Sequence, residues 1–96
     1  MGATVSPYLF SPGHIVATPG AMAAFEEAGE NPAPYLLRHL TGDWGDLDEF
    51  DKLQNESALK NDYRIFSAYD LKTGTRIWII TEADRSSTCL LLPSDY

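Results

Sequence analysis

The chain has 96 residues, of which 44% are hydrophobic and 22% charged, and its formal net charge is −7 at pH 7. This size and composition predict one ordinary globular domain, and the lack of repeats or low-complexity tracts argues against a solenoid or a disordered chain. No stretch approaches the ~18 apolar residues that a membrane span needs, no secretory signal is recognisable, and the single cysteine, Cys89, permits no internal disulfide. We therefore expect a soluble, cytoplasmic protein that makes no membrane contact.

Acidic residues are concentrated in the first two thirds of the chain. Residues 1–62 carry ten acidic side chains against Arg38, Lys52 and Lys60, whereas residues 63–96 carry four side chains of each sign. Because an acidic surface repels phosphates, direct nucleic-acid binding is disfavoured and the expected partner is a protein with a basic surface. A solvated acidic face that only keeps the protein in solution is the alternative.

The Pro and Gly positions divide the first half of the chain into short elements. Residues 1–13 are expected to form an irregular arm, and residues 14–96 a single α+β domain that opens with a short strand at residues 14–17. A helix is expected over residues 20–28. A second helix, opened by Pro34, follows a stiff proline-containing connector.

Both of these helices carry end signals. Thr18 is placed as an N-cap, Pro19 fits the first helical position, and Gly29 ends the first helix. Gly42 lies just past the second helix, where a left-handed residue belongs. The apolar side chains expected to face the core are Met22, Phe25, Tyr35, Leu36, Leu37 and Leu40.

A third helix is expected over residues 47–60. Asp46 and Glu49 have the spacing of a capping box. Four acidic side chains crowd its start, where the helix dipole favours negative charge: Asp46, Asp48, Glu49 and Asp51. The side chains expected to be buried are Phe50, Leu53 and part of Ala58–Leu59.

From residue 63 onward the apolar pattern is that of strands. Strands are expected at residues 63–69, 76–81 and 88–92, with turns at 71–75 and 82–86. The middle strand is apolar on both faces, so we expect helices on one face and the arm or a partner on the other. The predicted fold class is α+β, with three short helices packed on a three- to four-stranded antiparallel sheet.

No strong catalytic, cofactor or metal-binding motif is present, so neither a cofactor nor a metal is expected. Two turns nevertheless collect polar side chains that meet at one end of the sheet if the helices pack on it: Arg38, His39, Asp43 and Trp44 in one, and Thr81, Glu82, Asp84 and Arg85 in the other. In an enzyme, His39 would act as general base, Asp43 or Asp84 would orient it, and Arg85 would hold an anion. The alternative is a structural network in which the two aspartates pair with arginines and tie helix to sheet.

The favoured function is a non-enzymatic interaction module. Its contact surface would extend from Asp43 to Glu56, with Trp44 as an exposed anchor, whereas Trp78 is expected in the core. The residues assigned to this binding surface are Arg38, Trp44, Asp46, Asp48, Glu49 and Asp51. Three alternatives stay open: a small hydrolase-like enzyme, a mimic of DNA, and a homo-oligomer formed through the strand around Trp78.

Four runs of the sequence resemble one family. They are HIVATPGA from His14, RHLTGDWG from Arg38, FSAY from Phe66 and IWIITEADRS from Ile77. Together they resemble a group of small bacterial proteins described as plasmid-related or hypothetical, some of them labelled as accessories of restriction systems. The resemblance implies a bacterial, cytoplasmic protein with mobile-element or defence-associated neighbours, and it carries over no catalytic residues.

Overall fold

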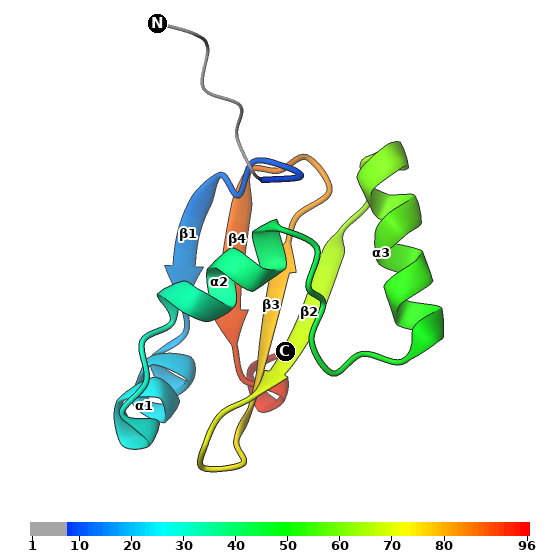
Figure 1. The fold of residues 1–96 in the computed structure, drawn as a ribbon. Helices are drawn as coiled ribbons and strands as arrows, with labels where there is room; N and C mark the ends of the chain where they lie inside the picture. The colour runs from blue at the N-terminus through cyan, green and yellow to red at the C-terminus, as the bar shows by residue number, and fades with distance from the viewer. Residues whose placement is uncertain (1–7) are drawn as a thin grey trace, which may run out of the picture.

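In the computed structural model, residues 8–96 are described, and they form three α-helices and one four-stranded sheet (Figure 1). In chain order the elements are β1 (His14–Ala17), α1 (Pro19–Ala28), α2 (Ala33–Leu40), α3 (Glu49–Asn61), β2 (Ile65–Asp70), β3 (Arg76–Thr81), β4 (Ser87–Leu91) and the 3-10 helix η1 (Pro93–Asp95). Residues 8–13 contain no helix or strand, and the rest of the expected arm lies outside the described residues.

The sheet has the strand order β1-β4-β3-β2. Strand β3 pairs antiparallel with both of its neighbours, whereas β1 runs parallel to β4. The predicted α+β class is confirmed, but the expectation of a purely antiparallel sheet is wrong. The reason is connectivity: tight hairpins force β2, β3 and β4 to alternate in direction, whereas β1 is joined to the sheet by a long helical connection that permits a parallel pair.

Local chemistry sets the ends of α1 as predicted. The Thr18 hydroxyl accepts a hydrogen bond from the Ala21 amide at 3.1 Å, Pro19 opens the helix, and Gly29 ends it with a left-handed φ of 67°. Phe25 is buried as expected, but Met22 is 48% exposed, because α1 extends past the edge strand β1 rather than lying fully on the sheet. In α2, Leu40 is buried and Leu37 is likewise about half exposed.

Helix α3 differs from the prediction at its start and in its buried face. It begins at Glu49, and its N-cap is Asp48, whose carboxylate accepts the Asp51 amide at 2.8 Å, so the Asp46–Glu49 capping box does not form. Phe50 and Leu53, expected in the core, are 69% and 66% exposed. The helix stands beside β2 instead of lying across the sheet (Figure 1), so its apolar pair faces outward.

The side chain of Asn55 holds α3 to the sheet. Its amide nitrogen donates to the Phe66 carbonyl oxygen at 2.5 Å, and its amide oxygen accepts the Phe66 N–H at 3.0 Å. One side chain thus satisfies both main-chain groups of an edge-strand residue, as a neighbouring strand would. Asn55 and Ala58 are the buried residues of α3.

The chain before α3 covers the rest of this sheet edge. The Ala68 amide donates to the Trp44 carbonyl oxygen, and the Asp46 amide donates to the Ala68 carbonyl oxygen at 2.8 Å. Gly45 lies between them with a φ of 74°, and a Cβ at this position would overlap the Ala68 carbonyl. Only glycine permits so close an approach of two main-chain segments.

The two faces of the sheet have different covers. One face carries the main core, which α1 and α2 complete; its fully buried members include Phe25, Tyr69, Ile77 and Ile79. On the opposite face, Tyr96 lies against Trp78, with ring centroids 5.9 Å apart. The expectation that the arm covers this second face is wrong for the described part of the arm, because Phe10 packs on the helix side.

Candidate functional site

His39 is fully buried between α2 and the sheet. Its Nδ1 lies 2.5 Å from the Ser67 hydroxyl oxygen, and its Nε2 lies 2.9 Å from the Thr81 hydroxyl oxygen. The Thr81 hydroxyl in turn lies 2.7 Å from that of Thr88, which donates to the Pro12 carbonyl oxygen at 2.7 Å. These five residues form one continuous hydrogen-bonded chain.

The Pro12 carbonyl sets the direction of every proton in this chain. Because a carbonyl only accepts, the Thr88 hydroxyl proton is committed to it, and Thr81 must donate to Thr88. The Thr81 proton is then also used, so His39 donates to Thr81 from Nε2 and accepts the Ser67 proton at Nδ1. A neutral imidazole with its proton on Nε2 therefore satisfies the whole network.

Burial reinforces the neutral state of His39. Removal of the imidazole from water lowers its pKa from 6.5 to about 3. A serine hydroxyl bonded to a histidine is also the first half of a nucleophile–base pair. Ser67 and His39 are both 0% exposed, however, so no substrate reaches them in this conformation and the pair acts as packing.

The predicted carboxylate partners of His39 bond elsewhere. Asp43 accepts two hydrogen bonds from the Arg38 guanidinium, at 2.7 and 3.4 Å, and this pairing lowers the pKa of its carboxyl group. Asp84 accepts the Ser86 amide at 2.9 Å and so shapes its own turn. Among the described residues, the hydrogen bonds of the His39 ring go to hydroxyl groups alone, and no relay joins the ring to either aspartate.

Arg85 acts on the end of α3 instead of on an anion. Its guanidinium donates to the carbonyl oxygens of Ala58 at 3.0 Å and Tyr63 at 2.7 Å, and it also bonds two carbonyls of its own turn. A cation at the C-terminal end of a helix satisfies carbonyls that have no partner within the helix. Arg85 thus ties the β3–β4 turn to α3, and it also lies over the ring of Phe10.

Trp44 is 4% exposed, so the expectation of an exposed anchor at this position is wrong. Its ring packs with Ala58 and Ile65 in a second core cluster, and its indole N–H donates to a carboxylate oxygen of Glu56 at 3.0 Å. The main-chain pairing of residues 44–46 with β2 turns the indole inward. This long-range pairing leaves no periodic pattern in the sequence.

The exposed apolar residues of this acidic region are on α3. The two apolar side chains, Phe50 and Leu53, are each about two-thirds exposed. They lie with Ser57 at helical spacing on the face of α3 that points away from the sheet. Glu49 and Glu56 flank Leu53 one turn to either side. Residues 46–62 hold six acidic side chains against two lysines, a net charge of −4. We call Glu49, Phe50, Leu53, Glu56 and Ser57 the outer face of α3.

The other predicted binding residues lie near this face, but they make contacts within the fold. Asp48 caps α3, Asp46 uses its main-chain amide to pair with β2, and Arg38 pairs with Asp43. The side chain of Glu49 is 89% exposed, and its carboxylate lies 3.9 Å from the Lys52 ammonium. The exposed large apolar side chains beside these acidic residues are therefore Phe50 and Leu53.

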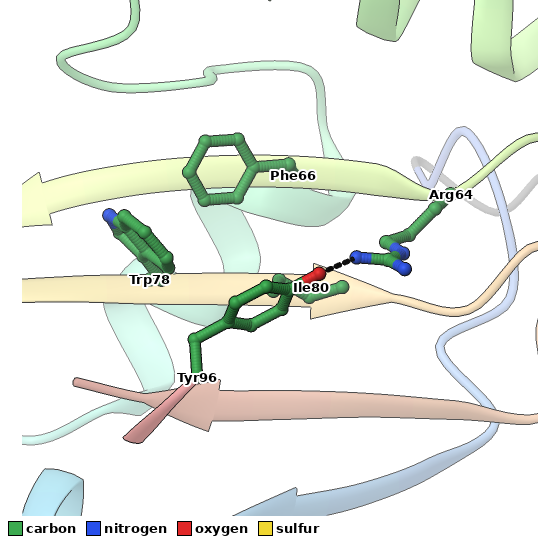
Figure 2. Close-up of a pocket in the computed structure, with 5 residues that line it drawn as sticks. All are labelled: Arg64, Phe66, Trp78, Ile80 and Tyr96. Atoms are coloured by element: carbon green, nitrogen blue, oxygen red, sulfur yellow. Dashed lines mark hydrogen bonds between the residues drawn. The ribbon is translucent and has the colours of Figure 1, made fainter. Parts of the chain in front are cut away.

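A separate hollow of about 270 Å³ lies on the sheet face opposite α1 and α2 (Figure 2). Phe66, Trp78 and Tyr96 form its aromatic walls, Ile80 lies at its floor, and the Arg64 guanidinium closes one end by donating to the Tyr96 hydroxyl. The Phe66 and Trp78 rings meet edge to face at 5.0 Å. Apolar walls and one cation suit a small apolar group that carries an acid.

Within residues 8–96, no group of three His, Cys, Asp or Glu side chains is placed to hold a metal ion. None of the helices described is both long and apolar enough to cross a membrane. Comparisons with models of protein families, with curated proteins and with solved structures found no match.

The alternation of residues in β2 and β3 is the sequence signal that indicates the His39 network. Ser67 alternates with Ile65 and Tyr69, and Thr81 with Ile79, so both hydroxyls fall on the face of the sheet that is otherwise apolar. A buried hydroxyl requires a hydrogen-bond partner. The nearest histidine in the preceding helices supplies it.

Proposed function

We propose that this protein is an interaction module whose contact surface is the outer face of α3. The observation that carries the proposal is the exposure of Phe50 and Leu53, two large apolar side chains on a helix of a chain that buries Trp44 nearby. Leaving such side chains in water has a cost that a partner would remove, at roughly 1.5–3 kcal/mol for each fully buried side chain. Aromatic residues at the centre of a contact are typical of binding hot spots.

The charge around these side chains specifies the kind of partner. Glu49 and Glu56 lie beside Leu53, and the region carries a net charge of −4. The complementary surface is an apolar groove with lysines or arginines at its rim, which an amphipathic helix face can enter. Basic surfaces of this kind are common on proteins that handle nucleic acids, and the resemblance to plasmid-related proteins supports a defence or nucleic-acid-processing complex as the partner.

A pair of matched variants tests this proposal. The double variant Phe50→Ser/Leu53→Ser removes the apolar centre, and Tyr63→Ser removes an aromatic side chain that is 61% exposed elsewhere. Proteins captured from a bacterial lysate by the wild type and by Tyr63→Ser, but not by the double variant, are the candidates to purify. With the purified partner, the double variant should raise the dissociation constant by about 100-fold, a loss of about 2.7 kcal/mol.

Salt dependence provides the second readout. Association of the wild type should slow as ionic strength rises, because salt screens the attraction between the acidic side chains of α3 and the basic rim of the partner. For the same reason, Glu49→Lys should weaken binding more at low salt than at high salt. Glu26→Lys, an exposed change of the same sign on α1, is the control. A partner that binds the double variant as tightly as the wild type would refute the assignment of this surface.

A further inference from the structure

The two edge strands of the sheet, β2 and β1, differ in the pairing of their outward main-chain groups. At β2, the Asn55 amide and the main chain of residues 44–46 pair with Phe66 and Ala68. At β1, the strand pairing of the described residues is confined to β4, and in Figure 1 no other strand lies along its outer side, although α1 projects past the lower end of the strand. An unpaired edge is a template for another strand.

The hydrogen bonds of β1 show which of its groups face outward. His14 donates its amide to Ser86 at 3.0 Å and Thr18 donates to Leu90 at 2.9 Å, so the even-numbered residues face β4. Since successive residues of a strand point their main-chain groups to opposite sides, the N–H and C=O groups of Ile15 and Ala17 face away from the sheet.

Apart from its short length of four residues, the outer edge of β1 lacks the features that usually prevent strand pairing. Residues 14–17 contain no lysine, no proline and no acidic group, and Ile15 and Val16 are each about half exposed. Beside the edge lies an apolar hollow of about 250 Å³, whose lining includes Ala17, Met22 and Leu36. An added strand would therefore find both main-chain partners and a place for a side chain.

Charge selects a second copy of this chain as the occupant. Although the protein has a net charge of −7, residues 8–25 carry no acidic or basic side chain other than His14, and residues 31–37 carry none. Two equally acidic molecules repel each other least where like charges are sparse, and β1 with its neighbouring hollow has no acidic residue of its own; the carboxylate of Asp95 lies at its end, where it accepts the Thr18 hydroxyl at 2.6 Å. The edge also contains both halves of a contact, a projecting Ile15 and the hollow beside Ala17.

We propose that two copies of the chain associate through antiparallel pairing of their β1 strands. With the two-fold axis at Val16, each Ile15 exchanges main-chain hydrogen bonds with Ala17 of the second copy, and the two Val16 side chains meet on the open face. Ile15 of one copy then lies at the mouth of the hollow formed by Ala17, Met22 and Leu36 of the other. The two sheets become one continuous sheet.

This pairing extends an apolar row that the sheet already has. Val16 is in register with Cys89, Cys89 with Ile80, and Ile80 with Phe66, so the row crosses all four strands of one copy. In the pair, the row continues from Val16 into the second copy. Pairing of the two β1 strands thus buries Val16, the exposed end of that row.

Sedimentation equilibrium of the full chain tests the proposal, over concentrations from about 10 µM to about 1 mM. The average mass of the wild type should rise with concentration toward twice the monomer mass. Val16→Lys places two like charges opposite each other and should raise the dissociation constant at least about tenfold, whereas Tyr63→Lys, exposed at a distance from β1, should not. A wild type that keeps the monomer mass throughout would overturn the proposal, as would a Val16→Lys variant that associates like the wild type.

Two readouts separate this contact from the partner contact at α3. Added salt should strengthen pairing through β1, since it screens repulsion between two acidic molecules, but should weaken binding of a basic partner. Amide exchange at Ile15 and Ala17 should slow as concentration rises, in the wild type and in Phe50→Ser/Leu53→Ser alike. Loss of self-association in the α3 variant would contradict the assignment to β1.

Discussion

Replacement of His39 with glutamine should remove most of the sensitivity to mild acid that this buried imidazole confers on the fold. The pKa of His39 falls from 6.5 to about 3 because burial disfavours its charged form. Between these two values the unfolded chain binds a proton that the folded chain does not, so the free energy of unfolding decreases as the pH falls. The stabilising effect of a neutral His39 is complete above pH 6.5 and is lost progressively below it.

The lowered pKa of His39 sets how much the free energy of unfolding decreases with pH. Each pH unit below 6.5 costs about 1.4 kcal/mol, so a loss of about 2.7 kcal/mol is expected at pH 4.5 from this residue alone. That is a large fraction of the roughly 5–10 kcal/mol that stabilises a domain of this size. Pairing with Arg38 lowers the pKa of Asp43 below the usual 3.8 of an aspartate, and carboxylates paired in this way contribute mainly below pH 4.5.

Urea unfolding followed by tryptophan fluorescence at several pH values between 7.5 and 4.5 measures the effect. The wild type should lose stability through this range, and His39→Gln, whatever its stability at pH 7.5, should show a much shallower decline. His14→Gln, which removes the exposed histidine of β1, should behave like the wild type. A His39→Gln curve parallel to that of the wild type, or an NMR titration of the wild-type His39 ring near pH 6.5, would refute the reasoning.

Three further changes test the contacts that hold the edge of the sheet and α3. Gly45→Ala should destabilise the fold by about 3 kcal/mol, because its Cβ would overlap a carbonyl of β2, whereas Gly74→Ala, with open space around it, should cost only about 1 kcal/mol in the same thermal unfolding assay. Asn55→Leu should cost about 2–4 kcal/mol and speed amide exchange at Phe66, whose two main-chain groups lose their partner. Arg85→Lys should cost about 1 kcal/mol in urea unfolding, because one ammonium cannot bond the several carbonyls that the guanidinium reaches.

Elements specified by neighbouring residues were predicted well. Strand β3 occupies residues 76–81 as expected, and Thr18, Pro19 and Gly29 act at the ends of α1 as their chemistry indicates. Strands β2 and β4 begin or end within two residues of the prediction. Each of these signals is contained in a few consecutive residues, so it does not depend on how the elements pack.

The errors concern residues whose surroundings come from distant parts of the chain. Phe50 and Leu53 have helical spacing, which predicts an apolar face but not that this face is turned outward. The orientation of α3 is set by Asn55, a polar residue whose role depends on the unpaired main chain of β2. Trp44 was expected at the surface because glycines flank it, yet one of these, Gly45, lets the main chain approach β2 and so buries the indole.

The α+β class, the acidic first two thirds of the chain and the ends of α1 can be read from the sequence, because helix caps, turns and alternation act over a few residues. Three features depend on the tertiary structure: His39 is a neutral core residue, Phe50 and Leu53 are exposed beside the acidic residues of α3, and β1 pairs with β4 alone among the described residues. Burial and strand pairing are properties of segments brought together from far apart, and the energies that govern them depend on contacts that no local pattern encodes.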